Sequence, residues 1–159
     1  MVGLLADGLI GQTIAAVIGT VAFSVLFGVP RHFYGYCGMI GGIGWIVYAC
    51  LEPWTGVQMA SYFATVMVIV LSRICAVRER CPATIFLVSG IFPLVPGAGI
   101  YWTSYYIVTN ELSLALDSGF TAMKVAVAIV LGIVSVFEIP QKWFSVVKTN
   151  EKKAKKREQ

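Results

Sequence analysis

Long apolar stretches alternate with short polar breaks along the chain, and this pattern predicts membrane-spanning helices. Five stretches are almost free of charged residues: Leu9–Phe27, Phe33–Leu51, Thr55–Ser72, Ala83–Val108 and Phe120–Ile139. Each is close to, or longer than, the ~20 residues that an α-helix needs to cross a hydrocarbon layer about 30 Å thick. We therefore expect an all-α integral membrane protein with about five transmembrane helices.

The composition of the whole chain supports this class. Hydrophobic residues make up 58% of the 159 residues and charged residues only 13%, with a mean hydropathy of +0.81. Soluble globular domains are about 45–50% apolar and about 25% charged. Disordered chains are poor in aromatic residues and rich in charge. Both a water-soluble globular protein and a disordered chain are therefore excluded.

The first apolar stretch is expected to remain in the membrane. No Lys or Arg precedes it, whereas a cleavable signal peptide has a basic start and a shorter apolar core. We expect residues 1–147 to form one transmembrane domain and residues 148–159 to form a basic cytoplasmic tail.

The positions of the basic residues predict an orientation. Eleven of the twelve Lys and Arg residues follow the first, third or fifth stretch, and Lys124 alone lies near the opposite ends. Because cytoplasmic segments carry the excess of Lys and Arg, the N-terminus is expected outside and the C-terminus inside. The basic run that starts at Lys148 is expected to contact anionic lipid headgroups rather than nucleic acid.

Glycines in the second stretch form a row typical of close helix packing. Gly38 and Gly42 make a GxxxG motif, and Gly35 lies on the same helix face. Glycines let helix backbones approach closely in lipid. We expect these three glycines to pack against another helix, within the chain or in a homo-oligomer, rather than to line a ligand site. The first stretch carries a similar row of small residues, Gly11, Ala15 and Gly19.

The fourth stretch is the only one with prolines inside it. Pro93 and Pro96 each remove an amide donor and clash with the preceding helical turn. Gly97 and Gly99 permit backbone conformations that other residues avoid. We expect the helix to break over Pro93–Gly99, about 10–14 residues into the stretch and near the centre of the bilayer.

An interrupted helix at this depth has a chemical consequence. Irregular backbone inside a membrane is tolerated only where it is buried in protein or lines a cavity. The new half-helix presents free amides and the positive end of its dipole, which suit a carboxylate. The alternative is a kink that only shapes packing. The candidate substrate-binding residues are Ser89, Pro93, Pro96, Gly97, Gly99 and Tyr101.

The sequence contains no motif typical of an enzyme active site or a metal site. The four cysteines form no CxxC pair and have no histidine at zinc-ligand spacing, so we expect reduced thiols and no metal site. There is no phosphate-binding lysine loop, no GxSxG and no HExxH. We therefore expect neither an enzyme nor a bound cofactor.

Several motifs occur together in a known order. The run Phe92–Tyr101 reads FPLVPGAGIY, and it is preceded by FGVPR at Phe27–Arg31, the glycine-rich run Gly38–Trp45, and RCPAT at Arg80–Thr84. This set resembles the threonine/serine exporter family, specifically its small-subunit or C-terminal half. The resemblance covers roughly residues 10–140.

The resemblance implies a transporter of the bacterial inner membrane. Family members are exporters or antiporters driven by the proton gradient, for threonine and serine or, in some two-subunit members, succinate. All of these substrates carry a carboxylate. Two alternatives remain: a scaffold or regulatory subunit that does not transport, and a passive channel.

The resemblance also implies a partner. Full-length members place a cytoplasmic domain and five spans before a half like this one, so we expect a larger subunit with a cytoplasmic N-terminal domain. The two halves would then form an inverted repeat. No ionisable residue lies mid-span here, so the proton-coupling group is expected in the partner. Glu138, the nearest acid, is expected to be solvated at the interface.

Overall fold

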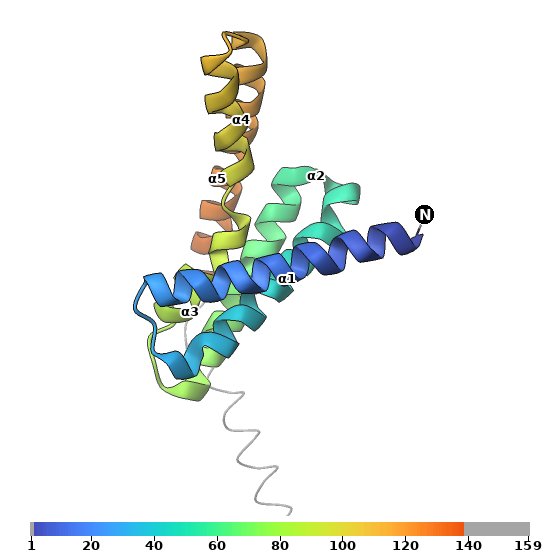
Figure 1. Cartoon of the computed structure of the whole chain (residues 1–159). Helices are drawn as coiled ribbons and strands as arrows, with labels where there is room; N and C mark the ends of the chain where they lie inside the picture. Colours follow the sequence, from blue (N-terminus) through green and yellow to red (C-terminus); the bar gives the residue numbers. More distant parts are fainter. Residues whose placement is uncertain (1, 139–159) are drawn as a thin grey trace, which may run out of the picture.

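The computed structural model describes residues 2–138 of the chain, with side chains from Gly8 onward (Figure 1). The basic tail expected at residues 148–159 lies outside the described residues. All regular structure in the described part is helical, which confirms the all-α fold. The elements are α1 (Val2–Leu26), η1 (Arg31–Phe33), α2 (Tyr34–Glu79), α3 (Thr84–Ile91), η2 (Phe92–Leu94), α4 (Gly97–Val108) and α5 (Leu112–Phe137), where η marks a 3₁₀ turn.

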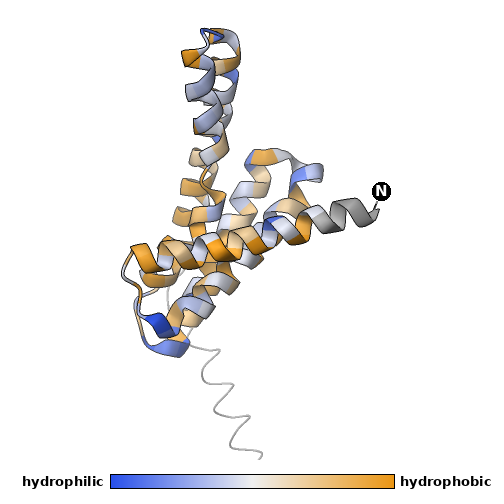
Figure 2. Cartoon of the chain, in the orientation of Figure 1, coloured by the Kyte–Doolittle hydropathy of each residue, from blue (hydrophilic) through white to orange (hydrophobic). Residues whose placement is uncertain are grey.

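Three helical segments of the described chain are long and apolar enough to cross a membrane: Gly8–Leu26, Arg31–Glu79 and Leu112–Phe137. The pair formed by Thr84–Leu94 and Gly97–Val108 makes a fourth, bent by 46°. Figure 2 shows apolar residues along all of these helices. Many of them are exposed, including Ile18 at 63%. A chain with so much exposed apolar surface requires lipid or protein around it.

The 46-residue helix α2 folds back on itself. At Gly56 the backbone leaves helical geometry, with φ 81° and ψ 164°. A Cβ atom on Gly44 would lie 2.5 Å from Cγ2 of Val68, yet in a straight helix these residues would be about 36 Å apart. Two antiparallel arms, residues 34–55 and 57–79, therefore meet at Gly56, and the turn is visible in Figure 1. The arms correspond to the second and third predicted stretches.

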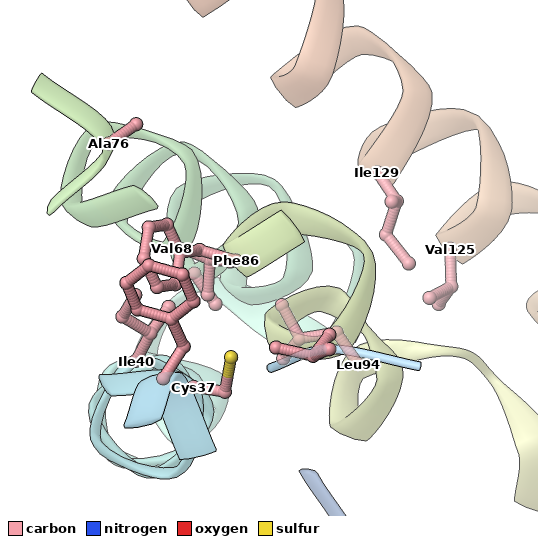
Figure 3. Packing of buried hydrophobic residues seen from close by; sticks show 11 residues of the cluster. Cys37, Ile40, Val68, Ala76, Phe86, Leu94, Val125 and Ile129 are labelled. Atoms are coloured by element: carbon pink, nitrogen blue, oxygen red, sulfur yellow. The ribbon is translucent and has the colours of Figure 1, made fainter. Parts of the chain in front are cut away.

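The core lies where α3 packs between the arms of α2 (Figure 3). Phe86 of α3 is fully buried and meets the Phe33 ring edge to face, with ring centroids 5.2 Å apart. Leu94 belongs to the same cluster, so the core also holds the beginning of the helix break. The buried cluster consists of Val29, Phe33, Cys37, Ile40, Ala64, Val68, Ala76, Phe86, Leu94, Val125 and Ile129.

Helix α1 packs against the glycine-rich face of α2. A Cβ atom on Gly38 or Gly42 would press on valines of α1, at 3.0 Å and 2.7 Å respectively, and one on Gly41 would overlap the Thr20 side chain. Gly35 differs, because it is exposed and a Cβ atom there would meet nothing within 4 Å. The glycines of α1 that are equally open are Gly8, Gly11 and Gly19.

Several helix boundaries differ from the sequence prediction, and α1 already begins at Val2, seven residues before the expected Leu9. The third stretch was expected to end at Ser72, but the second arm of α2 continues to Glu79 with Arg73 buried inside it. The Arg73 guanidinium donates to the backbone carbonyl of Phe137 at 3.2 Å. It also lies 4.8 Å from the centroid of the Phe137 ring. A cation at the negative end of α5 is stabilised there. Helix α5 itself begins at Leu112, eight residues before the expected start.

Candidate functional site

The helix break lies between α3 and α4 and confirms the interruption expected over Pro93–Gly99. After the 3₁₀ turn η2, Val95 is extended (φ −60°, ψ 114°) and Pro96 has φ −49° and ψ 49°. Helical structure resumes at Gly97. Each proline lacks the backbone N–H that a continuous helix needs at that position, so the two prolines interrupt the helix.

The break divides this segment into two nearly equal parts. Thr84–Leu94 and Gly97–Val108 each extend about 16–18 Å at ~1.5 Å per residue. Since the hydrocarbon layer is about 30 Å thick, a segment divided in this way places its interruption near the middle of the membrane.

A cavity of about 270 Å³ opens beside the break. Its walls come from both arms of α2, the break itself and α5. This volume is just below the ~300–1,000 Å³ of pockets for drug-sized ligands, so it suits a small metabolite. None of the described lining residues is charged. They are Trp45, Tyr48, Val57, Ser61, Pro93, Leu94, Val95, Pro96, Gly97, Ala98, Gly99, Thr121, Ala122 and Val125.

The first turn of α4 lines this cavity. Pro96 precedes the helix and makes no side-chain cap. The Gly97 amide donates to the carbonyl of Val95. For the amides of Ala98 and Gly99, no acceptor is found within residues 2–138. Uncapped amides at a helix N-terminus, together with the positive end of the helix dipole, form a site that favours an anion.

Trp45 lies on the opposite wall of the cavity. Part of its indole ring is exposed, but Nε1 is buried and has no acceptor among the described residues. Its ring lies 5.3 Å from that of Tyr48, centroid to centroid. The Ser61 hydroxyl, in contrast, already donates to the Val57 carbonyl at 2.7 Å. Neither the Trp45 N–H nor the Ser61 hydroxyl hydrogen is therefore a free donor on the cavity surface.

Four of the predicted site residues line the cavity together: Pro93, Pro96, Gly97 and Gly99. The two glycines differ in their surroundings. A Cβ atom on Gly97 would meet nothing within 4 Å, whereas one on Gly99 would lie 2.9 Å from Cβ of Ala122. Gly97 therefore leaves space open, and Gly99 also allows α4 to approach α5.

The other two predicted residues lie outside the cavity lining. Tyr101 is 62% exposed, on a face of α4 where its ring contacts Trp102. Ser89 is fully buried in α3, and its hydroxyl has no partner within the described chain. Most other serine and threonine hydroxyls of these helices donate to the carbonyl four residues earlier, as Ser72 does to Val68. Ser89 is an exception to that pattern.

Sequence reasoning did not identify the walls contributed by α2 and α5. Tyr48, Ser61 and Thr121 lie in apolar helices with no local pattern that marks a site. Trp45 alone gave a signal, because it ends the glycine-rich run that begins at Gly38.

The fold and the site together define a multi-pass helical membrane protein with an interrupted helix beside an uncharged cavity, an arrangement typical of secondary transporters. A family model described as "Threonine/Serine exporter, ThrE" matches residues 12–139. The chain belongs to this family, which makes it a transporter of the threonine/serine exporter type. The match confirms the resemblance to this family that the motifs indicated. No solved structure matches the chain significantly.

Proposed function

We propose that this protein is the small membrane subunit of a secondary exporter for small metabolites that carry a carboxylate. The proposed substrates are threonine, serine and succinate, and the proposed driving force is the proton gradient. One observation carries the proposal: the uncharged cavity at the helix break is lined by Ala98 and Gly99, whose amides have no acceptor among the described residues.

Carboxylate binding follows from the kind of groups that line the cavity. Amide donors at the start of α4 favour negative charge, and the partly enclosed apolar walls strengthen this preference because they exclude water. None of the described lining residues is acidic, so nothing on these walls repels an anion. Threonine and serine, which give the family its name, each carry a carboxylate.

A partner completes the proposed exporter. The cavity walls described here contain no group that titrates near neutral pH, and Glu138 is exposed at the end of α5. We therefore assign the proton-carrying group, and the acceptor for a substrate ammonium group, to a larger family subunit with a cytoplasmic N-terminal domain. The resemblance to one half of full-length members supports this assignment.

The proposed topology has five crossings in the inner membrane, with the N-terminus outside. The two arms of α2 count as separate crossings, because each is about 33 Å long at ~1.5 Å per residue. The bent pair α3–α4 forms the fourth crossing and α5 the fifth. Alternating access would then take place around the break, with the other subunit as the inverted half.

The transport proposal is tested in proteoliposomes that contain the protein together with the larger subunit. An imposed pH gradient is expected to drive accumulation of labelled threonine, serine or succinate against its concentration gradient, and a protonophore is expected to abolish it. Equilibration without accumulation would indicate a passive channel. Equal transport by the larger subunit alone would indicate a scaffold role for this chain.

Two native cysteines test the orientation. Cys50 is exposed near the Gly56 turn, and Cys81 lies in the connection between α2 and α3. In intact cells, a membrane-impermeant maleimide is expected to label a Cys50-only variant and not a Cys81-only variant. Burial raises the pKa of the Cys81 thiol, and the thiolate is the reactive form. Labelling is therefore done at mildly alkaline pH.

The control for this experiment is permeabilisation, after which Cys81 is expected to react. Thr55→Cys provides a second reporter at the same turn as Cys50, because Thr55 is exposed there. Labelling of Cys81 in intact cells, with Cys50 protected, would reverse the proposed orientation.

A further inference from the structure

We infer that a small pocket at the end of α2 binds the phosphate group of an anionic phospholipid. The pocket has a volume of about 250 Å³ and shares no lining residue with the cavity at the helix break. The inference requires only that the chain is a membrane protein, so it does not depend on the proposed substrate site. The lining residues are Arg73, Ala76, Val77, Arg80, Cys81, Pro82 and Ala83.

One face of α2 forms the first wall of this pocket. Arg73, Ala76, Val77 and Arg80 follow the spacing i, i+3, i+4 and i+7, which places residues on one side of a helix. Arg80 ends the helix in the left-handed conformation, with φ 56° and ψ 40°. The chain then turns back, and the amides of Arg80 and Cys81 both donate to the Ala76 carbonyl. The connection to α3 therefore forms the second wall.

The charge of the pocket is positive. Arg73 is only 6% exposed, and its guanidinium is held by the backbone carbonyl and the ring of Phe137. Arg80 is exposed, and no hydrogen bond or ion pair of its side chain is found within residues 2–138. None of the described lining residues is acidic, and the neighbouring Glu79 accepts a hydrogen bond from Tyr36 on the other arm of α2. The pocket thus combines a fixed positive charge with a guanidinium that is available to an anion.

The place and the lining of the pocket favour a lipid over a soluble anion. The pocket lies at the end of the apolar segment Arg31–Glu79, where a membrane helix reaches the headgroup region. Basic pockets between membrane helices bind anionic headgroups at this level, and the planar fork of arginine matches phosphate oxygens. Ala76, Val77 and Pro82 make the rest of the lining largely apolar. Apolar walls suit the glycerol and first acyl carbons of a lipid, and they provide nothing for a hydrated phosphate ion.

The test measures how strongly the purified full-length chain retains phosphatidylglycerol. Native mass spectrometry of micelles that also contain phosphatidylcholine gives the apparent Kd, at about 0.2 M salt so that diffuse charge attraction is screened. The wild type is expected to retain phosphatidylglycerol in preference to phosphatidylcholine. Arg80→Gln is expected to weaken this retention about tenfold, because it removes a charged hydrogen-bond donor. Arg80→Asn is a second variant, since asparagine tolerates the left-handed backbone at this position.

The matched control is Arg78→Gln. Arg78 is exposed and lies two residues from Arg80, but it does not line the pocket. The apparent Kd of this variant is expected to stay within about twofold of the wild type. Every variant keeps residues 148–159, so any contribution of that basic segment is the same in all of them.

Three results would overturn the inference. Equal weakening by Arg80→Gln and Arg78→Gln would mean that diffuse surface charge alone attracts the lipid. Equal retention of phosphatidylglycerol and phosphatidylcholine by the wild type would mean that the pocket does not select an anionic headgroup. Inorganic phosphate, added at constant ionic strength, is expected to leave the lipid bound. Displacement of phosphatidylglycerol by inorganic phosphate would instead assign the pocket to a soluble phosphate.

Discussion

Replacement of Gly97 by leucine is expected to abolish export while the protein still inserts into the membrane. A Cβ atom at this position would meet nothing within 4 Å, so the first side-chain carbon creates no collision. Because Gly97 lines the 270 Å³ cavity, we expect the leucine side chain to fill part of it and to cover the amides of Ala98 and Gly99. Two lost hydrogen bonds to a charged group, together about 3 kcal/mol or more, weaken substrate binding by about a hundredfold or more.

The measurement is efflux of labelled substrate, with the amount of membrane-inserted protein determined by immunoblot. A size series provides the internal control: Gly97→Ala is expected to retain part of the activity, Gly97→Val less, and Gly97→Leu none. Wild-type efflux by the leucine variant would mean that the break only shapes helix packing.

The second large effect is expected from Gly41→Ala, which acts on the fold. A Cβ atom at Gly41 would overlap the Thr20 side chain, which is fully buried at the contact between α1 and α2. Overpacking of this kind costs about 1–3 kcal/mol. We expect a lower Tm in detergent and a weakened α1–α2 contact.

Gly35→Ala is the matched control, since it makes the same change on the same helix at an open position. Its Tm is expected to equal or slightly exceed that of the wild type, because alanine favours a helix by up to about 1 kcal/mol over glycine. Equal losses of Tm in the two variants would contradict the packing of α1 on α2 described above.

The features that the sequence predicted are those that local chemistry determines. The apolar stretches are visible because each helix must cover its own length with apolar side chains. The break at Pro93–Gly99 is visible because proline removes a backbone donor wherever it occurs. The family motifs, quoted from the same residues, agree with the family match.

The features that the sequence missed depend on contacts between helices. Arg73 marked a helix end by its charge, yet it is buried because the end of α5 lies against it. Gly35 shares a helix face with Gly38 and Gly42, but α1 does not approach it. The sequence pattern predicts which face of a helix packs against another helix. The length over which the two helices touch depends on the angle between them.

The candidate site divides in the same way. Proline and glycine chemistry placed the break and the start of α4, but the opposite wall required the fold, because Trp45 and Thr121 come from two other helices. Tyr101 is among the predicted site residues, but the turn of α4 directs it away from the cavity. Closeness to the break along the sequence does not determine which side of a helix faces the cavity.

The tight turn at Gly56 has a consequence for biogenesis. The two arms of α2 are joined without a polar loop, and the residues around the turn carry one charged group, Glu52. Few charged groups therefore have to cross the membrane when this turn is inserted. We therefore expect the two arms to enter the bilayer as one hairpin, in which Gly44 packs against Val68.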